Sequence, residues 1–230
     1  MLSSPAPSPY APSPYDSARA HMVEGQLRPN QVTDPRILAV MGQVPRELFV
    51  PSTLVNVAYL DEDMPLIAGR ALMPPMVLAR VIQALEIKSG DRVLDLAPGT
   101  GYSTLVLSYL AHDVIGVEPH ALLCQEAETA LATSPPHGKA KILAGAPVEG
   151  CGAYAPFDAI LINGSVEQIP PLLFAQLSEG GRLAAVMRNP NGCGEARLYR
   201  KKNDGVIETI LFDAQIRPAP GFDIPRGFAF

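Results

Sequence analysis

The sequence predicts an α/β fold with a mostly parallel sheet, antiparallel strands at its C-terminal end and a helical region before the sheet. From residue 92 onward, short apolar runs alternate with helical patterns, which is typical of a parallel sheet covered by helices on both faces. The last part of the chain changes character. Residues 196–201 and 206–214 alternate around the turn Asn203-Asp204-Gly205, as two antiparallel strands do.

The chain opens on a proline-rich segment that cannot contribute to a core. Residues 1–17 contain the tandem repeat Ala-Pro-Ser-Pro-Tyr, and we expect a disordered tail there. The N-terminal helical region is expected to span 18–88. Its helices are predicted at about 18–28, at 34–44 with Asp34 as cap and Pro35 in the first position, and at 75–86, whereas 53–72 is expected to be irregular, with Asp61, Glu62 and Asp63 in an exposed acidic turn.

The sheet region is expected to span 89–230. Its parallel strands are predicted at 92–96, 114–117, 140–143, 157–162 and 182–187. The helices between them are predicted at 102–110, 121–132 and 170–177. Ligands of such sheets bind outside the carboxyl ends of the strands, so we expect the site at that edge.

Composition limits the function classes. A chain of 230 residues with 47% apolar content fits one α/β domain with a sizeable core. The net charge of −5 provides no basic field for nucleic acid or anionic membrane, and no apolar run is long enough to span a bilayer. No signal-peptide pattern is present, so we expect a cytoplasmic protein, with a monomer favoured. Cys124, Cys151 and Cys193 have no metal-ligand spacing, and no metal is expected.

Residues 92–101 carry the most informative motif. An apolar strand there contains Asp95 and leads into a turn with Gly99 and Gly101, where the backbone can approach a ligand closely. The helix that follows offers unpaired N–H groups. The next strand ends in Glu118, whose carboxylate can accept both hydroxyls of a ribose. These features predict a cofactor that contains a nucleoside, with an ordinary strand–helix turn as the alternative.

The motif also favours one cofactor over another. A dinucleotide site requires Gly-x-Gly-x-x-Gly, but Thr104 stands at the position of the third glycine. Asp95 would repel a pyrophosphate, whereas a cationic sulfonium tolerates a nearby carboxylate. S-adenosylmethionine is therefore favoured over NAD, and an NAD oxidoreductase is the weakest option.

Ordered fragments run through about residues 22–190. They are Met22-Val23-x-x-Gln26-Leu27, Asp34-Pro35-Arg36-Ile37-Leu38, Val44-Pro45-Arg46-Glu47-x-Phe49-Val50-Pro51, Gly90-Asp91-Arg92-Val93-Leu94-Asp95, Gly99-x-Gly101-Tyr102, Gly116-Val117-Glu118, Pro156-Phe157-Asp158-Ala159-Ile160 and Gly180-Gly181-Arg182-Leu183. Their order and spacing resemble the protein-L-isoaspartate O-methyltransferase family. The resemblance implies a Rossmann-like fold and S-adenosylmethionine-dependent methyl transfer to the carboxylate of isoaspartyl residues in damaged proteins or peptides.

The resemblance also implies where the ligands bind. Loop 95–101 is expected to hold the methionine end of the cofactor and Glu118 its ribose. The expected cofactor-binding residues are Asp95, Leu96, Ala97, Gly99, Gly101, Glu118, Pro119 and Ala146, with His120 close by. The acceptor-side candidates are Met73, Asn163 and Ser165. No catalytic acid or base is assigned, because a carboxylate acceptor is already ionised near pH 7.

Three departures from the family pattern matter. Ala97 replaces the first glycine of the loop, which is tolerated if its φ angle is negative. Ala146 replaces an aspartate that contacts the adenine amino group. Met73 replaces the serine at the substrate carboxylate, and Ala71 replaces a threonine. Two alternatives therefore stay open: a non-catalytic relative that serves as a binding scaffold, and a methyltransferase with a different acceptor.

Overall fold

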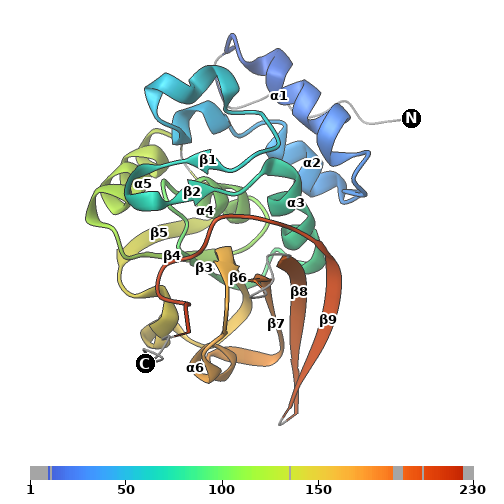
Figure 1. Ribbon diagram of the computed structural model, residues 1–230, viewed down its shortest axis with the longest axis vertical. Helices are drawn as coiled ribbons and strands as arrows, with labels where there is room; N and C mark the ends of the chain where they lie inside the picture. Colours follow the sequence, from blue (N-terminus) through green and yellow to red (C-terminus); the bar gives the residue numbers. More distant parts are fainter. Residues whose placement is uncertain (1–9, 11, 135, 189–193, 204, 225–230) are drawn as a thin grey trace, which may run out of the picture.

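The computed structural model describes residues 10, 12–134, 136–188, 194–203 and 205–224. Its centre is a seven-stranded sheet in the order β5-β4-β3-β6-β7-β8-β9 (Figure 1). The strands are β3 (Arg92–Leu96), β4 (Asp113–Glu118), β5 (Lys139–Ala144), β6 (Phe157–Val166), β7 (Leu177–Arg188), β8 (Gly194–Lys202) and β9 (Gly205–Asp213). β3 to β7 pair in parallel and β7-β8-β9 pair antiparallel. The predicted α/β sheet with an antiparallel end is confirmed.

The central strands β3, β4 and β6 are buried on both faces of the sheet, which explains why they are mostly apolar. In β3, Val93 belongs to one core cluster and Leu94 to the other, because successive side chains of a strand point to opposite faces. The first face packs against the helical N-terminal region and the helices α3 (Pro75–Ala84), α4 (Tyr102–Ser108) and α5 (Ala121–Thr133). The second face packs against α6 (Pro171–Ala175).

The boundary between α6 and β7 differs from the prediction. The helix expected over 170–177 ends at Ala175, and β7 begins at Leu177. Leu177 pairs with Phe157 of β6, and the register then shifts before Arg182 pairs with Ala159. Gly180, at φ 75°, lies in that irregular stretch. A strand with such a bulge near its start does not alternate regularly between its two faces. The sequence therefore placed Leu177, the first residue of β7, in the helix.

The N-terminal region is helical, as predicted. It contains α1 (Asp16–Met22), the π-helical turn η1 (Val23–Leu27) and α2 (Pro35–Met41). The side chain of Asp34 accepts the backbone N–H of Arg36 at 2.8 Å, so the predicted cap of α2 is confirmed. α1 begins inside the stretch that the sequence assigned to a tail, because Asp16 accepts the backbone N–H of Ser13 at its start. Residues 1–9 and 11 of that tail lie outside the described residues.

The 3-10 turn η2 (Arg46–Phe49) precedes the stretch 53–72 that was expected to be irregular. That stretch contains most of a second 3-10 turn, η3 (Ser52–Val57), and then a small hairpin. We call residues 64–72 the 64–72 hairpin: β1 (Met64–Pro65) and β2 (Ala71–Leu72) pair antiparallel around η4 (Ile67–Gly69). Figure 1 shows this hairpin above the β3–β4 part of the sheet. Strands of two residues have no detectable periodicity, so the sequence did not predict them.

The acidic turn before this hairpin is not simply solvated, which corrects the expectation. Asp61 accepts the backbone N–H of Met76 at 2.9 Å, at the start of α3. Asp63 accepts the backbone N–H of Arg217 at 2.8 Å. Both carboxylates therefore join segments that are distant in the sequence.

The C-terminal segment 214–224 runs back over the end of β6, which the sequence did not predict (Figure 1). Ser165 donates its backbone N–H to the Arg217 carbonyl, and Ala219 donates its own to the Ser165 carbonyl, both at 2.9 Å. Gly164 has φ 132°, and a Cβ added there would lie 2.6 Å from the Ala219 nitrogen. Only glycine allows this approach. Across the described part of the chain, no helix is long and apolar enough to cross a membrane.

Candidate cofactor site

The turn between β3 and α4 has an unusual backbone. Ala97, Gly99 and Gly101 all have positive φ angles, at 58°, 62° and 89°. From the sequence, we expected Ala97 to be tolerated if its φ angle is negative. Its φ angle is positive, so the expected negative angle is wrong. A left-handed alanine costs about 1–2 kcal/mol. The strained angle is held by the Ala97 N–H, which donates to the Val117 carbonyl of β4 at 2.8 Å.

Asp95 lies below this turn and is fully buried. Its Oδ2 accepts the hydroxyls of Ser103 and Thr104, both at 2.7 Å, and its Oδ1 accepts the Asn163 side-chain amide at 2.6 Å. Burial raises the pKa of Asp95 to about 6, although these three hydrogen bonds favour the charged form. Asp95 therefore ties β3 to the first turn of α4 and to β6, and its oxygens are engaged by the chain's own donors.

Glu118 ends β4 beside the same turn and is also fully buried. Its Oε2 accepts the Gly99 N–H at 2.8 Å, and its Oε1 accepts the His120 N–H at 3.3 Å. The parallel register of β3 and β4 brings the two strand ends together, as the sequence predicted. A carboxylate next to a glycine amide at this edge is the arrangement expected for a ribose site.

The 64–72 hairpin covers this carboxylate with Arg70, a residue that sequence reasoning missed. Arg70 Nη2 lies 3.3 Å from Glu118 Oε2 and donates to the Ala97 carbonyl at 2.5 Å. Leu66 comes from the same hairpin, and its Cδ1 lies 2.8 Å from where a Gly99 Cβ would stand. The site is thus enclosed by the turn, the end of β4 and the hairpin.

The remaining cofactor candidates lie around this centre. Leu96 is buried, and its carbonyl accepts the Asn163 side-chain amide at 3.1 Å. Pro119 is exposed and Ala146 is half-buried at the start of η5 (Pro147–Glu149). The neighbour of Ala146, Gly145, donates its N–H to the Glu118 carbonyl at 3.2 Å, which brings the end of β5 to the same edge. Gly101 begins α4 and faces α5, where its Cβ would lie 3.0 Å from that of Ala127.

The three acceptor-side candidates are all buried, and each contacts another part of the chain. Met73 is buried in the core cluster, and its carbonyl accepts Arg46 Nη2 at 2.8 Å. Ser165 donates its hydroxyl to the Ile216 carbonyl at 2.9 Å, beneath the 214–224 segment. Asn163 is the third, and it contacts Asp95 as described above. The local sequence carries no signal for the long-range hydrogen bonds that Met73 and Ser165 make.

The residues present fit a ligand rich in hydroxyl and amino groups. In the described part of the chain, Arg70 Nε and His120 Nδ1 are buried without a hydrogen-bond partner. Both belong to residues that contact Glu118. Unpartnered buried nitrogens are unfavourable, so a polar ligand at Glu118 would give His120 Nδ1 the hydrogen bond that it lacks.

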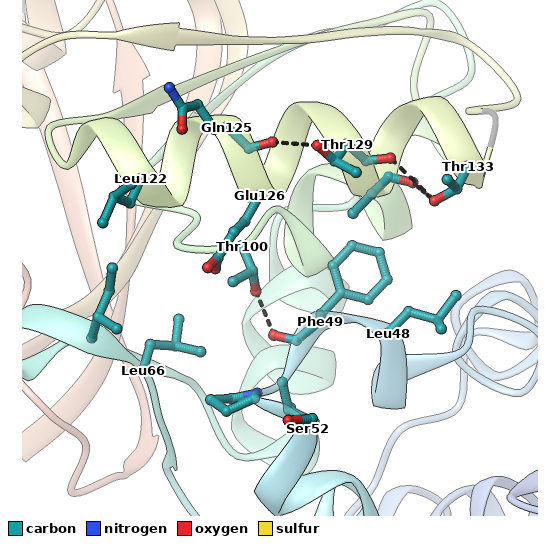
Figure 2. Close-up of a pocket in the computed structure, with 14 residues that line it drawn as sticks. Leu48, Phe49, Ser52, Leu66, Thr100, Leu122, Gln125, Glu126, Thr129 and Thr133 are labelled. Atoms are coloured by element: carbon teal, nitrogen blue, oxygen red, sulfur yellow. Dashed lines mark hydrogen bonds between the residues drawn. The ribbon is translucent and has the colours of Figure 1, made fainter.

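A cavity of about 650 Å³ lies next to the site rather than in it (Figure 2). Leu66 and Thr100 line it, and the Thr100 hydroxyl donates to the Phe49 carbonyl at 2.6 Å. Its other wall comes from α5, including Leu122 and Glu126. Asp95 and Glu118 do not line this cavity, so the turn and the hairpin separate the two.

Among the described residues, no group of three or more His, Cys, Asp or Glu side chains is placed to hold a metal ion. Cys124 donates its thiol to the Glu118 carbonyl at 3.2 Å and is buried. Cys151 is a free thiol. Cys193 lies outside the described residues.

Comparisons with known proteins identify the family. The family model of the protein-L-isoaspartate(D-aspartate) O-methyltransferases matches residues 17–215. The chain is 37% identical over 202 residues to protein-L-isoaspartate O-methyltransferase 2 of Shewanella sediminis, covering 86% of this chain and 82% of that protein. It is also 37% identical over 192 residues to the protein-L-isoaspartate O-methyltransferase of Methanoculleus marisnigri, covering 84% and 86%.

Solved structures agree on the fold. A protein-L-isoaspartate O-methyltransferase superposes with a TM-score of 0.77 at 23% identity, covering 88% of this chain and 66% of that one. A putative protein-L-isoaspartate O-methyltransferase from Plasmodium falciparum, in complex with S-adenosyl-L-homocysteine, gives 0.75 at 21% identity, covering 87% and 97%. The fold is therefore the Rossmann-like one of these proteins. With the family model matched over most of its length, the chain belongs to the protein-L-isoaspartate(D-aspartate) O-methyltransferase family.

Proposed function

We propose that this protein is an S-adenosylmethionine-dependent O-methyltransferase that acts on the carboxylate of isoaspartyl residues in damaged proteins or peptides. Family membership supports the reaction class. The observation that carries the proposal is the position of Glu118, fully buried at the end of β4 and 2.8 Å from the Gly99 N–H. A carboxylate at this strand end, beside the turn between β3 and α4, is in position to accept the hydroxyl groups of a ribose.

Glu118 would hold the ribose, and the 97–101 turn would hold the methionine end. S-adenosylmethionine, when bound, supplies a methyl group on a sulfonium, which a carboxylate oxygen accepts as the neutral thioether leaves. The acceptor is ionised near pH 7, so the protein needs no general base. Its residues align the acceptor and exclude water. Asp95 keeps the turn in place through Ser103, Thr104 and Asn163.

The two parts of the chain would divide this work. Residues 89–230 form the cofactor-binding core, and residues 18–88 are placed to form the acceptor side, because the 64–72 hairpin covers Glu118. The net charge of −5 supports a partner other than nucleic acid. We propose that the partner is a damaged protein or peptide. We also propose that this protein acts in the cytoplasm and as a monomer.

A different acceptor is the second candidate, and one observation favours it. Ala71 in the 64–72 hairpin and Met73 just after it carry no side-chain hydroxyl, and Met73 is buried. Each hydrogen bond lost to an acceptor is worth roughly 0.5–1.5 kcal/mol, and more for a charged one. An isoaspartyl carboxylate would therefore be held less tightly than by a site with those hydroxyls.

Transfer of a labelled methyl group tests the proposal. The assay compares an isoaspartyl peptide with the same peptide carrying ordinary aspartate, and binding of S-adenosylmethionine is measured in parallel by calorimetry. Base-labile label on the isoaspartyl peptide alone is the expected result. Cofactor binding without transfer to either peptide would favour the different acceptor. An absence of binding at millimolar cofactor would contradict the methyltransferase proposal itself.

A further inference from the structure

Arg70 fills the space beside the carboxylate that is proposed to hold the ribose. Its Nη2 lies 3.3 Å from Glu118 Oε2, the oxygen that also accepts the Gly99 N–H. The same nitrogen donates to the Ala97 carbonyl at 2.5 Å. Only 5% of Arg70 is exposed, so the guanidinium is enclosed with Glu118 rather than paired at the surface.

This arrangement satisfies Arg70 only in part. Its Nε is buried without a partner in the described part of the chain. Burial lowers the pKa of Arg70, and Glu118 offsets part of that effect. A buried cation that keeps an unpaired donor is less well stabilised than a fully hydrogen-bonded one. A set of contacts that also gave Nε a partner would stabilise the guanidinium better than this one does.

The turn that precedes Arg70 is short and exposed. The two residues before Arg70, Ala68 and Gly69, have left-handed φ angles of 53° and 72°, and both are exposed. β1 and β2 pair over only two residues each. The hydrogen bond from the Leu66 N–H to the Arg70 carbonyl, 2.8 Å, closes the turn between them. The tip of the hairpin is thus exposed, whereas Met64, Arg70 and Leu72 at its base are buried.

We propose that Arg70 determines the cofactor affinity of this protein and its selectivity between cationic and neutral adenosyl ligands. This inference rests on the proposed function. In the free protein, Arg70 occupies Glu118 Oε2 and neutralises its charge. Glu118 must release Arg70 before it can accept both hydroxyls of a ribose. S-adenosylmethionine carries a sulfonium charge that S-adenosylhomocysteine lacks, so a guanidinium near Glu118 disfavours the first ligand more strongly.

Calorimetric titration of both ligands against four proteins tests this inference. Arg70→Gln removes the charge, Arg70→Lys keeps it, and Arg28→Gln is the matched control, because Arg28 makes an exposed ion pair with Glu24. We expect R70Q to bind both ligands at least about fivefold more tightly than wild type. The gain should be larger for S-adenosylmethionine. R70K should keep the wild-type preference, and R28Q should match wild type for both.

The outcomes separate this inference from the proposed function. If R70Q binds no more tightly than wild type, the inference is overturned while the methyltransferase proposal stands. Weaker binding by R70Q would show in addition that Arg70 contacts the ligand. If neither ligand binds any of the four proteins, the proposed function fails. Thermal denaturation checks the fold of each variant. Should R70Q not fold, Arg70→Met keeps the apolar stem in place and carries the same expectations.

Discussion

The side-chain amide of Asn163 donates to Asp95 Oδ1 at 2.6 Å, which joins β6 to β3 beneath the cofactor turn. Both residues are buried, and the same nitrogen also donates to the Leu96 carbonyl at 3.1 Å. Asn163 thus completes the set of donors around Asp95. β3 lies between β4 and β6 in the sheet. Asn163 on β6 therefore supports the turn from one neighbouring strand, and Glu118 on β4 supports it from the other.

Asn163→Ala should destabilise the protein. The change leaves Asp95 Oδ1 buried without its donor, and an unsatisfied buried acceptor costs about 1–3 kcal/mol. Urea denaturation measures the free energy of unfolding. Asn56→Ala is the control, because its exposed side chain only accepts the Tyr15 hydroxyl. Equal stabilities of the two variants would contradict the role given to Asn163.

Asp95 should make stability fall as the pH rises between about 4 and 6. Its pKa is raised from 3.8 to about 6 by burial. Over that range the unfolded chain loses the proton while the folded chain keeps it, so the folded state binds more protons and each added pH unit weakens it. At about 1.4 kcal/mol per pKa unit the total is of order 3 kcal/mol.

Asp95→Asn removes this titration, so urea denaturation of both proteins at several pH values isolates the effect. Other carboxylates titrate in both proteins and cancel in the difference. The stability advantage of wild type over the variant should shrink from pH 4 to pH 6 and then level off. A difference that does not change with pH would show that Asp95 titrates alike in the folded and unfolded chains.

Ala97→Gly should stabilise the protein. Ala97 has φ 58°, and glycine adopts that angle without the steric cost that alanine has. Glycine also makes the unfolded chain more flexible, so the net gain is at most about 1 kcal/mol. Ala132→Gly in α5, an exposed helical position, should instead lose about 1 kcal/mol. Thermal denaturation midpoints that move in the same direction would contradict the strained angle.

Gly164→Ala should detach the 214–224 segment from β6. The added Cβ would lie 2.6 Å from the Ala219 nitrogen, and φ is 132° there, so the loss should exceed about 1 kcal/mol. Hydrogen exchange of the Ala219 amide should become faster. Gly90→Ala is the matched control, because no atom lies within 4 Å of its Cβ position. Slow exchange in the Gly164 variant would refute the close approach.

Regular elements of this fold could be predicted from local patterns. β3 was predicted at 92–96 and lies at those residues, because Val93, Leu94 and Leu96 mark a strand that is buried on both faces. The cap Asp34 and the first residue Pro35 of α2 were likewise confirmed, since capping acts over a few neighbouring residues. The parallel order of the strands then brought Gly99 and Glu118 together.

The contacts that fill the site could not be predicted in this way. Arg70 approaches Glu118 across 48 residues from a hairpin whose strands are too short to show a period. Ser165 was proposed for the acceptor side, but its hydroxyl is bound by the Ile216 carbonyl from a segment without regular structure. Such long-range contacts depend on tertiary packing, for which the local sequence carries no signal.

The binding of S-adenosylhomocysteine to Glu118→Gln tests the central claim most directly. The amide is nearly isosteric but cannot accept two hydroxyls as a carboxylate does. Calorimetry should show that wild type binds and that the variant binds about tenfold to a hundredfold more weakly, because hydrogen bonds to a charged group are worth about 1.5–3 kcal/mol. Equal affinity in wild type and variant would contradict the assignment of Glu118 to the ribose.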